Sequence, residues 1–308
     1  MSQRPDLPAA WALDVPVLNA PMGGVAGGRL AAAVSAAGGL GMIGNGSSST
    51  AEALQVQLAL LGDMDRFGIG LIDWVLRKEP MLWRAALDAS PVALSVSFGT
   101  DFGWVSEARS VGAVTITQVF DVDGACRAQD AGVDVVVARG LEGGGHGEPH
   151  RTRTQLLPDV IAAVDKPVLA AGGISTANDV RAALRAGAAG VWIGTAFAAC
   201  PEALTTAGQR ATMIAASGTD TVLTRAVDTA LGYPWSPQHP SRVIANEFSR
   251  RWTGREEALA ADASARAELR EAMAADDTRV VPVDAGMGVG AIEAARPAAE
   301  VVDALMRS

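Results

Sequence analysis

The chain has 308 residues, 49% of them hydrophobic and 19% charged, with a formal net charge of −9. This composition supports a large buried core and excludes an intrinsically disordered chain. The negative charge, the absence of a basic run, and apolar stretches too short for a bilayer argue against nucleic-acid or membrane binding. With no apolar signal segment near the N-terminus, we expect a cytoplasmic protein.

Eight short, continuously apolar runs alternate with Ala-rich helical stretches along the chain. Such runs are typical of strands that are covered on both faces. The expected strands span residues 15–22, 40–45, 67–74, 92–99, 114–120, 133–140, 168–174 and 191–197. Their alternation with helices predicts an α/β fold, a closed (β/α)8 TIM barrel. The rival is a doubly wound open sheet, which usually has fewer strands and places its glycine fingerprint after the first of them.

Two of the helices have recognisable ends. Thr176 and Asp179 form a capping arrangement, and the helix they begin is expected to stop at Gly187. A second helix is expected over residues 123–131, ending at Gly132.

The alternation of strands and helices ends after Cys200. Residues 205–280 contain no convincing strand, but a proline-marked stretch and a charged, Ala-rich helix pattern. We therefore expect 205–280 to be a helical insertion or lid over the barrel mouth, with residues 1–204 and 281–308 forming the barrel. Tyr233, Trp235 and His239 are expected to shape the pocket beneath it.

The first strand ends in the sequence NAPMGG, residues 19–24. A strand that ends in proline and two glycines exposes main-chain N–H and C=O groups at the barrel rim. A planar isoalloxazine edge could be bound there by the main chain, with Met22 as a polarizable surface. An ordinary turn between strand and helix explains the same residues.

Glycine pairs follow the seventh and eighth strands. They are AGGIS, which contains Gly172 and Gly173, and IGT, which contains Gly194 and Thr195. Glycines let a phosphate approach the main chain closely, and barrels bind phosphate after these two strands. The alternative is that the glycines serve only tight packing.

The sixth strand leads into the sequence RGLEGGGHG, which carries His146. The glycines before it, including Gly145, could let the imidazole lie against a flat ligand. His146 is one of only three histidines, so few groups could act as a base near neutral pH. Glu142 is a second acid or a residue that orients the loop. Three strand-end residues are either flavin partners or polar filling of the barrel: Ser95, Ser97 and Gln118.

The remaining reactive side chains favour no other chemistry. Cys126 and Cys200 have no close cysteine or histidine neighbours in the sequence, so we expect neither a disulfide nor a metal site. A Schiff-base aldolase needs a lysine at a strand end. Neither Lys78 nor Lys166, the only lysines, has that position.

Taken together, these motifs resemble the nitronate monooxygenase (2-nitropropane dioxygenase-like) family of FMN enzymes, to which FMN-dependent enoyl-ACP reductases are related. The resemblance covers residues 20–44, 140–147, 156–175, 187–197, 242–248 and 284–302. It implies FMN at the barrel mouth, with its phosphate at Gly172, Gly173, Gly194 and Thr195, and its ring near Ala20, Met22 and Gly23. Gln118 and Gly145 complete the expected cofactor site, and His146 would hold the nitro oxygens or take the α-proton of a nitroalkane.

Three positions depart from the family pattern. Gly70 stands where an asparagine is usual, Arg139 where a glutamine is frequent, and Ala196 where an arginine is common. Each difference changes a polar group that the resemblance implies to be close to the cofactor, so the substrate can differ from a nitronate.

The main interpretation is an FMN-dependent monooxygenase that oxidises an alkyl nitronate or similar small carbon acid with O2. The alternative is an NAD(P)H-dependent FMN reductase of an enoyl or related unsaturated substrate. A flavin-free barrel that binds a phosphorylated metabolite and a non-catalytic flavin carrier are further alternatives. The electron donor stays open, as does whether the chain forms a homo-oligomer.

Overall fold

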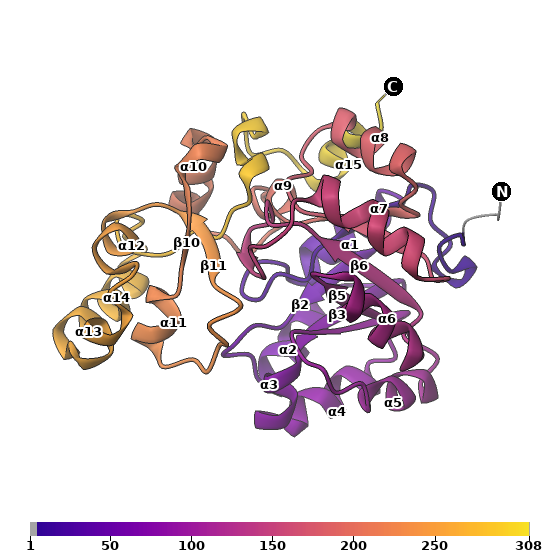
Figure 1. Cartoon of the computed structure of the whole chain (residues 1–308), viewed down its shortest axis with the longest axis horizontal. Coiled ribbons are helices and arrows are strands. Elements are labelled where there is room, and N and C mark those ends of the chain that lie inside the picture. The colour runs from indigo at the N-terminus through magenta and orange to yellow at the C-terminus, as the bar shows by residue number, and fades with distance from the viewer. Residues whose placement is uncertain (1–4, 308) are drawn as a thin grey trace.

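Eight parallel strands form the barrel (Figure 1). Each strand lies inside one of the predicted runs or begins one residue before it. The computed structural model describes residues 5–307. The strands are β1 (Val17–Asn19), β2 (Gly41–Gly44), β3 (Phe67–Ile72), β4 (Ala93–Ser97), β5 (Val114–Val119), β6 (Val135–Arg139), β8 (Val168–Ala171) and β9 (Gly190–Ile193).

The barrel closes between its first two strands. The sheet runs in the order β1-β9-β8-β6-β5-β4-β3-β2, and a parallel bridge from Leu18 to Leu40 joins its two ends. The Asn19 side chain reinforces this short junction. The Met42 amide N–H donates to Asn19 Oδ1 (2.8 Å), and Asn19 Nδ2 donates to the Met42 carbonyl (2.9 Å). A side-chain amide thus replaces a missing rung of the backbone ladder, and the predicted TIM barrel is confirmed.

Replacing Asn19 with leucine should lower the free energy of unfolding by about 2–5 kcal/mol, because two buried backbone groups of Met42 would lose their partners. Urea denaturation measures the change. The matched control is Thr117→Val, which removes one buried hydrogen bond to the Val96 carbonyl and should cost about 1 kcal/mol. If Asn19→Leu costs no more than this control, Asn19 does not hold the barrel closed.

Helices cover the outside of the barrel. They are α1 (Gly28–Ala36), α2 (Ala51–Ala59), α3 (Asp73–Lys78), α4 (Pro80–Asp88), α5 (Trp104–Ser110), α6 (Val122–Asp130), α7 (Arg153–Ala163), α8 (Ala177–Ala186), α9 (Thr195–Ala198) and α15 (Ala298–Met306). The predicted ends of α8 are confirmed: Thr176 and Asp179 form a capping box, and Gly187 is left-handed with φ 105°. The predicted helix over 123–131 is α6, shifted by one residue.

Two apolar cores follow from the alternation of side chains along the strands. One fills the barrel interior and includes Trp11, Ile116 and Leu169. The other lies between the strands and the surrounding helices and includes Leu30 and Val160. Because strands buried on both faces need apolar residues at every position, the runs in the sequence are continuous rather than alternating.

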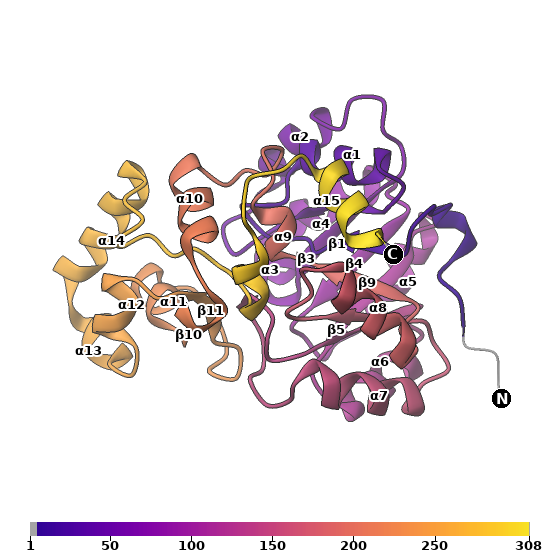
Figure 2. The same ribbon diagram turned by 90° about the horizontal axis from the view of Figure 1, so that it is seen from above.

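Residues 205–280, hereafter the insertion, form a lobe beside the barrel, drawn in orange in Figures 1 and 2. Its helices are α10 (Ala207–Ala215), α11 (Ala226–Leu231), α12 (Glu247–Trp252), α13 (Glu256–Ala261) and α14 (Ala263–Ala275). The expectation that the insertion lacks strands is wrong. Its strands β10 (Thr221–Thr224) and β11 (Ser241–Ile244) pair with each other, and β11 also pairs with β7 (Gly145–His146). Each has only four residues, so its partner in space decides its conformation.

The chain returns from the insertion to the barrel. A 3₁₀ helix at Met287–Ala291 precedes α15, which packs against α1 and α8. The division at residues 204 and 281 stays a prediction, and residues 1–4 and 308, which it includes, lie outside the described part. Among residues 5–307, no helix is long and apolar enough to cross a membrane.

Candidate active site

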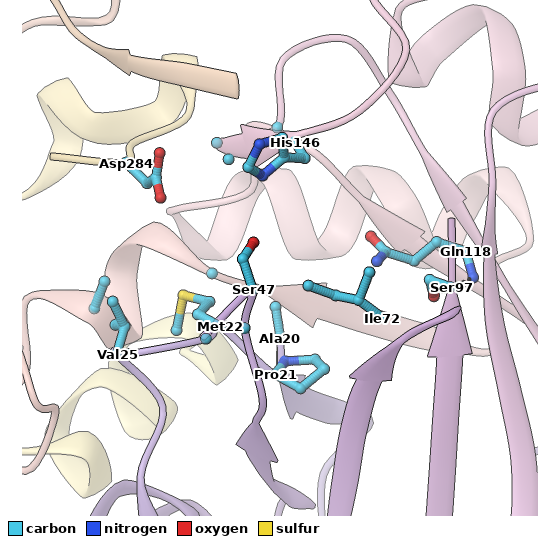
Figure 3. A pocket seen from close by; sticks show the side chains of 18 of the residues that line it. Ala20, Pro21, Met22, Val25, Ser47, Ile72, Ser97, Gln118, His146 and Asp284 are labelled. Carbon is cyan, nitrogen blue, oxygen red and sulfur yellow. Dashed lines mark hydrogen bonds between the residues drawn. The ribbon is translucent and has the colours of Figure 1, made fainter. Parts of the chain in front are cut away.

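A cavity of about 570 Å³ lies at the carboxyl ends of the barrel strands, within the size range of small-molecule sites. Figure 3 shows His146 and Asp284 on one side of it, and Ala20, Pro21 and Met22 on the opposite side. All the residues predicted to bind cofactor or to act in catalysis line this cavity: Ala20, Met22, Gly23, Gln118, Gly145, His146, Gly172, Gly173, Gly194 and Thr195.

The loop after β1 forms the floor of the cavity. The Ala20 amide donates to the Ile193 carbonyl (2.8 Å), which ties the loop to β9. A Cβ atom on Gly23 would lie 2.3 Å from Gly46 Cα, so the loops after β1 and β2 meet at a distance that only glycine permits. Both glycines therefore have a packing role, in addition to any contact with a ligand.

The absence of a side chain at Gly70 is explained by the same loop. A Cβ atom at this position would lie 2.2 Å from Pro21 Cγ, because the proline ring fills the space beside β3. Ala196 is buried in the core around the barrel and is not among the residues that line the cavity. These two departures from the family pattern are thus accommodated by packing.

The glycines after β8 and β9 form an open cradle at one end of the cavity. Gly172 and Gly173 have φ values of +102° and +65°, which side-chain-bearing residues rarely adopt. At Gly194 an added Cβ would have only Met22 Sδ (3.4 Å) and Ala20 Cβ (3.8 Å) as close neighbours, so the position is not tightly packed. Such a cradle lets an anion reach backbone N–H groups directly.

The C-terminal part of the chain closes one side of this cradle. The Gly286 amide donates to Thr195 Oγ1 (2.9 Å). Gly288 approaches Ser175, whose Oγ would lie 2.4 Å from an added Cβ. Ser175 and Gly288 both line the cavity, although neither was predicted as a site residue. The glycine-rich sequence DAGMGVG was the only signal for this contribution.

His146 lies on β7 and is held by the insertion. Its Nε2 is 2.9 Å from Asp228 Oδ2, and the indole of Trp235 stacks on the imidazole with centroids 3.7 Å apart at an interplanar angle of 7°. The pairing of His146 with Ser241 fixes its backbone against β11. The cavity is lined by His146 but by neither of the other two histidines.

Two of the glycines around His146 make room for a buried arginine, and whether the imidazole also lies against a flat ligand stays a prediction. Trp235 covers one face of the imidazole, and Gly143 and Gly147 leave room for Arg139, whose guanidinium would overlap a Cβ atom at either position. Arg139 Nη2 donates to the carbonyls of Gly144 (2.9 Å) and Gly145 (3.2 Å). Burial, with a contribution from Arg242, lowers the pKa of Arg139 to about 10. It therefore remains charged at neutral pH and anchors the loop that presents His146.

Two carboxylates beside His146 were missed by sequence reasoning. Asp228 lies on α11, and Asp284 lies in the segment that returns to the barrel. Burial raises the pKa of Asp284, while the neighbouring imidazole of His146 and the hydroxyl of Ser241 partly offset that effect. Ser241 Oγ donates to Asp284 Oδ1 (2.8 Å). No sequence signal marked either acid, because both meet His146 only through the fold.

Aromatic side chains form the wall behind Trp235. Trp235 Nε1 donates to Ser47 Oγ (3.0 Å), which connects the insertion to the loop after β2. His239 packs against the rings of Phe98 (5.5 Å) and Phe120 (5.6 Å). Burial, followed by the charges of His146 and Arg139, lowers the pKa of His239 to about 4, so this imidazole is neutral at physiological pH. Tyr233 lines the cavity together with Trp235.

Four further residues that were singled out from the sequence are Glu142, Ser97, Gln118 and His150. The backbone N–H of Arg153 donates to both carboxylate oxygens of Glu142 (3.1 and 2.9 Å), so this acid orients the loop. Ser97 Oγ accepts from the backbone N–H of Gln118 (3.1 Å), and both residues line the cavity. His150 is exposed.

Comparisons with known proteins agree with this geometry. The model of a family described as nitronate monooxygenase matches residues 82–308. A nitronate monooxygenase of Pseudomonas aeruginosa is 29% identical, over 84% of this chain and 95% of that protein. An indene-carboxyl-CoA dehydrogenase of Rhodococcus jostii, with the full name (3aS,4S,5R,7aS)-5-hydroxy-7a-methyl-1-oxo-octahydro-1H-indene-4-carboxyl-CoA dehydrogenase, is 32% identical over 69% of this chain, and the match spans 60% of its length.

Two solved structures share the whole fold. FabK from Thermotoga maritima superposes with a TM-score of 0.83 at 28% identity, covering 96% of this chain and 93% of that one. The nitroalkane oxidase of Streptomyces ansochromogenes superposes with a TM-score of 0.79 at 26% identity, covering 96% of each chain.

Proposed function

Because the chain belongs to the nitronate monooxygenase family, whose members are flavin-dependent oxidoreductases, we propose that it binds FMN and oxidises alkyl nitronates or similar small carbon acids with O2. The observation that carries this proposal is the position of His146. Its imidazole lines a cavity that also contains the open glycine cradle and the β1 loop. A base, an anion cradle and a main-chain floor are the parts that such an enzyme needs.

The cavity fits a flavin mononucleotide. Gly172, Gly173 and Gly194 line the cavity without side chains of their own, and we infer that they receive the phosphate. Ala20, Met22 and Gly23 would lie against the ring, with Gln118 and Gly145 as further contacts. We favour FMN over FAD because the cradle would hold a phosphate at the end of the ligand, and FMN ends in its phosphate. Chromatography of heat-released flavin tests this choice, and recovery of FAD would contradict it.

The bound flavin would supply the transfer of electrons from substrate to O2. The protein supplies position and proton transfer. His146 takes the proton from the α-carbon of a neutral nitroalkane, or donates a hydrogen bond to the nitro oxygens of a nitronate. Trp235, which donates a hydrogen bond to Ser47, would limit the access of water on the side of the insertion.

Oxygen consumption by the FMN-loaded protein tests the proposed reaction. We expect consumption with an alkyl nitronate such as propyl-1-nitronate in the absence of NADH and NADPH. The similarity to FabK favours a second candidate, the NAD(P)H-dependent FMN reductase of an unsaturated substrate. If the nitronate gives no oxygen consumption while NADH or NADPH oxidation depends on an enoyl thioester, the second candidate replaces the first.

A further inference from the structure

The catalytic imidazole is held by a carboxylate from the insertion. Asp228 Oδ2 lies 2.9 Å from His146 Nε2, across 82 positions in the sequence. We propose that Asp228 is a positioning residue that keeps the proton of His146 on Nε2, so that Nδ1 exchanges the proton with the substrate. This inference rests on the proposed function, because it assigns the atom of His146 that acts in that reaction.

The chemistry of the pair determines the tautomer. An ionised carboxylate can only accept a hydrogen bond, so Nε2 must carry the hydrogen that joins it to Asp228. In the neutral imidazole the second nitrogen then has a free lone pair, which is the state that a base requires. Both side chains are largely removed from water, with 19% of His146 and 9% of Asp228 exposed. A charge-assisted hydrogen bond is strong under these conditions.

The position of Nδ1 agrees with this assignment. No hydrogen bond among residues 5–307 engages Nδ1 of His146. The fully buried side-chain nitrogens that lack a partner within that range are Trp74 Nε1, Arg153 Nε and Trp252 Nε1. His146 Nδ1 also lacks a partner but is not one of them, so it is not fully buried. His146 lines the cavity, and we infer that this free nitrogen meets the substrate there.

Trp235 restrains the remaining freedom of the ring. Its indole covers one face of the imidazole at 3.7 Å, so rotation about the Cβ–Cγ bond would drive the ring into the indole. Asp228 and Trp235 both belong to the insertion, on α11 and in the loop that follows it. The barrel therefore contributes the base, and the insertion contributes the two groups that orient it.

The other nearby acid does not have the geometry for this role. Asp284 faces the same imidazole, but its described hydrogen bond comes from Ser241 Oγ. Asp284→Asn therefore removes a neighbouring carboxylate without removing the hydrogen bond to Nε2. It separates a general effect of negative charge from the specific positioning by Asp228.

The tautomer is measured by ¹⁵N NMR of the FMN-loaded protein with ¹⁵N-labelled histidine, at a pH where the imidazole is neutral. The chain has only three histidines, and the His146 signals are assigned by their absence in His146→Asn. We expect the Nε2–H tautomer in the wild type and in Asp284→Asn. In Asp228→Ala we expect a mixture of tautomers, and also in the isosteric Asp228→Asn, whose amide can either donate or accept.

Kinetics provide a second readout. Asp228→Asn should lower kcat/KM for a neutral nitroalkane by about tenfold, the loss expected for one charge-assisted hydrogen bond, and should change kcat/KM for the preformed nitronate much less. An unchanged tautomer in both Asp228 variants would overturn the inference, as would an equal shift in Asp284→Asn. The tautomer is read without substrate. Failure of nitronates as substrates would therefore count against the proposed function, while a tautomer shift confined to the Asp228 variants would still support the inference.

Discussion

Replacing His146 with asparagine is expected to lower kcat/KM for a neutral nitroalkane by about 10²–10⁴-fold, the range for loss of general-base catalysis. Flavin should remain bound, because the glycine cradle and the β1 loop are separate from this side chain. Asparagine retains a hydrogen-bonding group near Asp228 and has no titratable nitrogen. Initial rates of oxygen consumption with nitroethane, together with the absorbance of bound flavin, measure both quantities.

The substrate pair separates proton removal from binding. A preformed nitronate has already lost its α-proton, so His146→Asn should affect it much less than the neutral nitroalkane. The matched control is His150→Asn, since His150 is exposed and outside the cavity; this variant should keep wild-type rates. Full activity of His146→Asn on nitroethane would show that His146 is not the base.

Replacing Gly194 with leucine is the second change with a large expected effect. Gly194 lines the cavity, and the leucine side chain is expected to occupy the space where the phosphate would bind. A phosphate would then lose at least one charge-assisted hydrogen bond to the main chain, worth about 1.5–3 kcal/mol each. We expect the Kd for FMN to rise by about 10²-fold, because each 1.4 kcal/mol corresponds to about tenfold. Titration of the apoprotein by quenching of FMN fluorescence measures it.

Gly194→Ala is the matched control for steric blocking. Gly194 has φ −99°, which alanine adopts without strain, and its Cβ would make only ordinary contacts with Met22 and Ala20. This variant should fold normally and change the Kd for FMN much less. Equal FMN affinity in the leucine variant and the wild type would place the phosphate elsewhere.

Most of the fold followed from local patterns. The eight barrel strands are continuous apolar runs, because both of their faces are buried, and the ends of α8 were set by a capping box and a glycine. The strands of the insertion were not predictable in this way. Residues 241–244 have the sequence SRVI, and their extended conformation depends on pairing with Thr221–Thr224 and with His146.

The candidate site was predictable where function depends on backbone shape and on rare residue types. Glycine pairs after consecutive strands and a single histidine in a glycine loop are visible in a linear sequence. Asp228 was missed because it reaches His146 only after the insertion packs against the barrel. Arg139 was noticed as a departure from the family pattern, but its role in filling the space left by Gly143 and Gly147 is a property of the packed loop.

The most direct test of the account is an anaerobic titration of the purified, FMN-loaded protein followed by visible absorbance. We expect an alkyl nitronate to bleach the flavin bands in the absence of NADH and NADPH, and admission of O2 to restore them. A protein that shows no flavin absorbance even after incubation with FMN would contradict the flavin site. Bleaching by NADH or NADPH, with none by a nitronate, would contradict the proposed reaction.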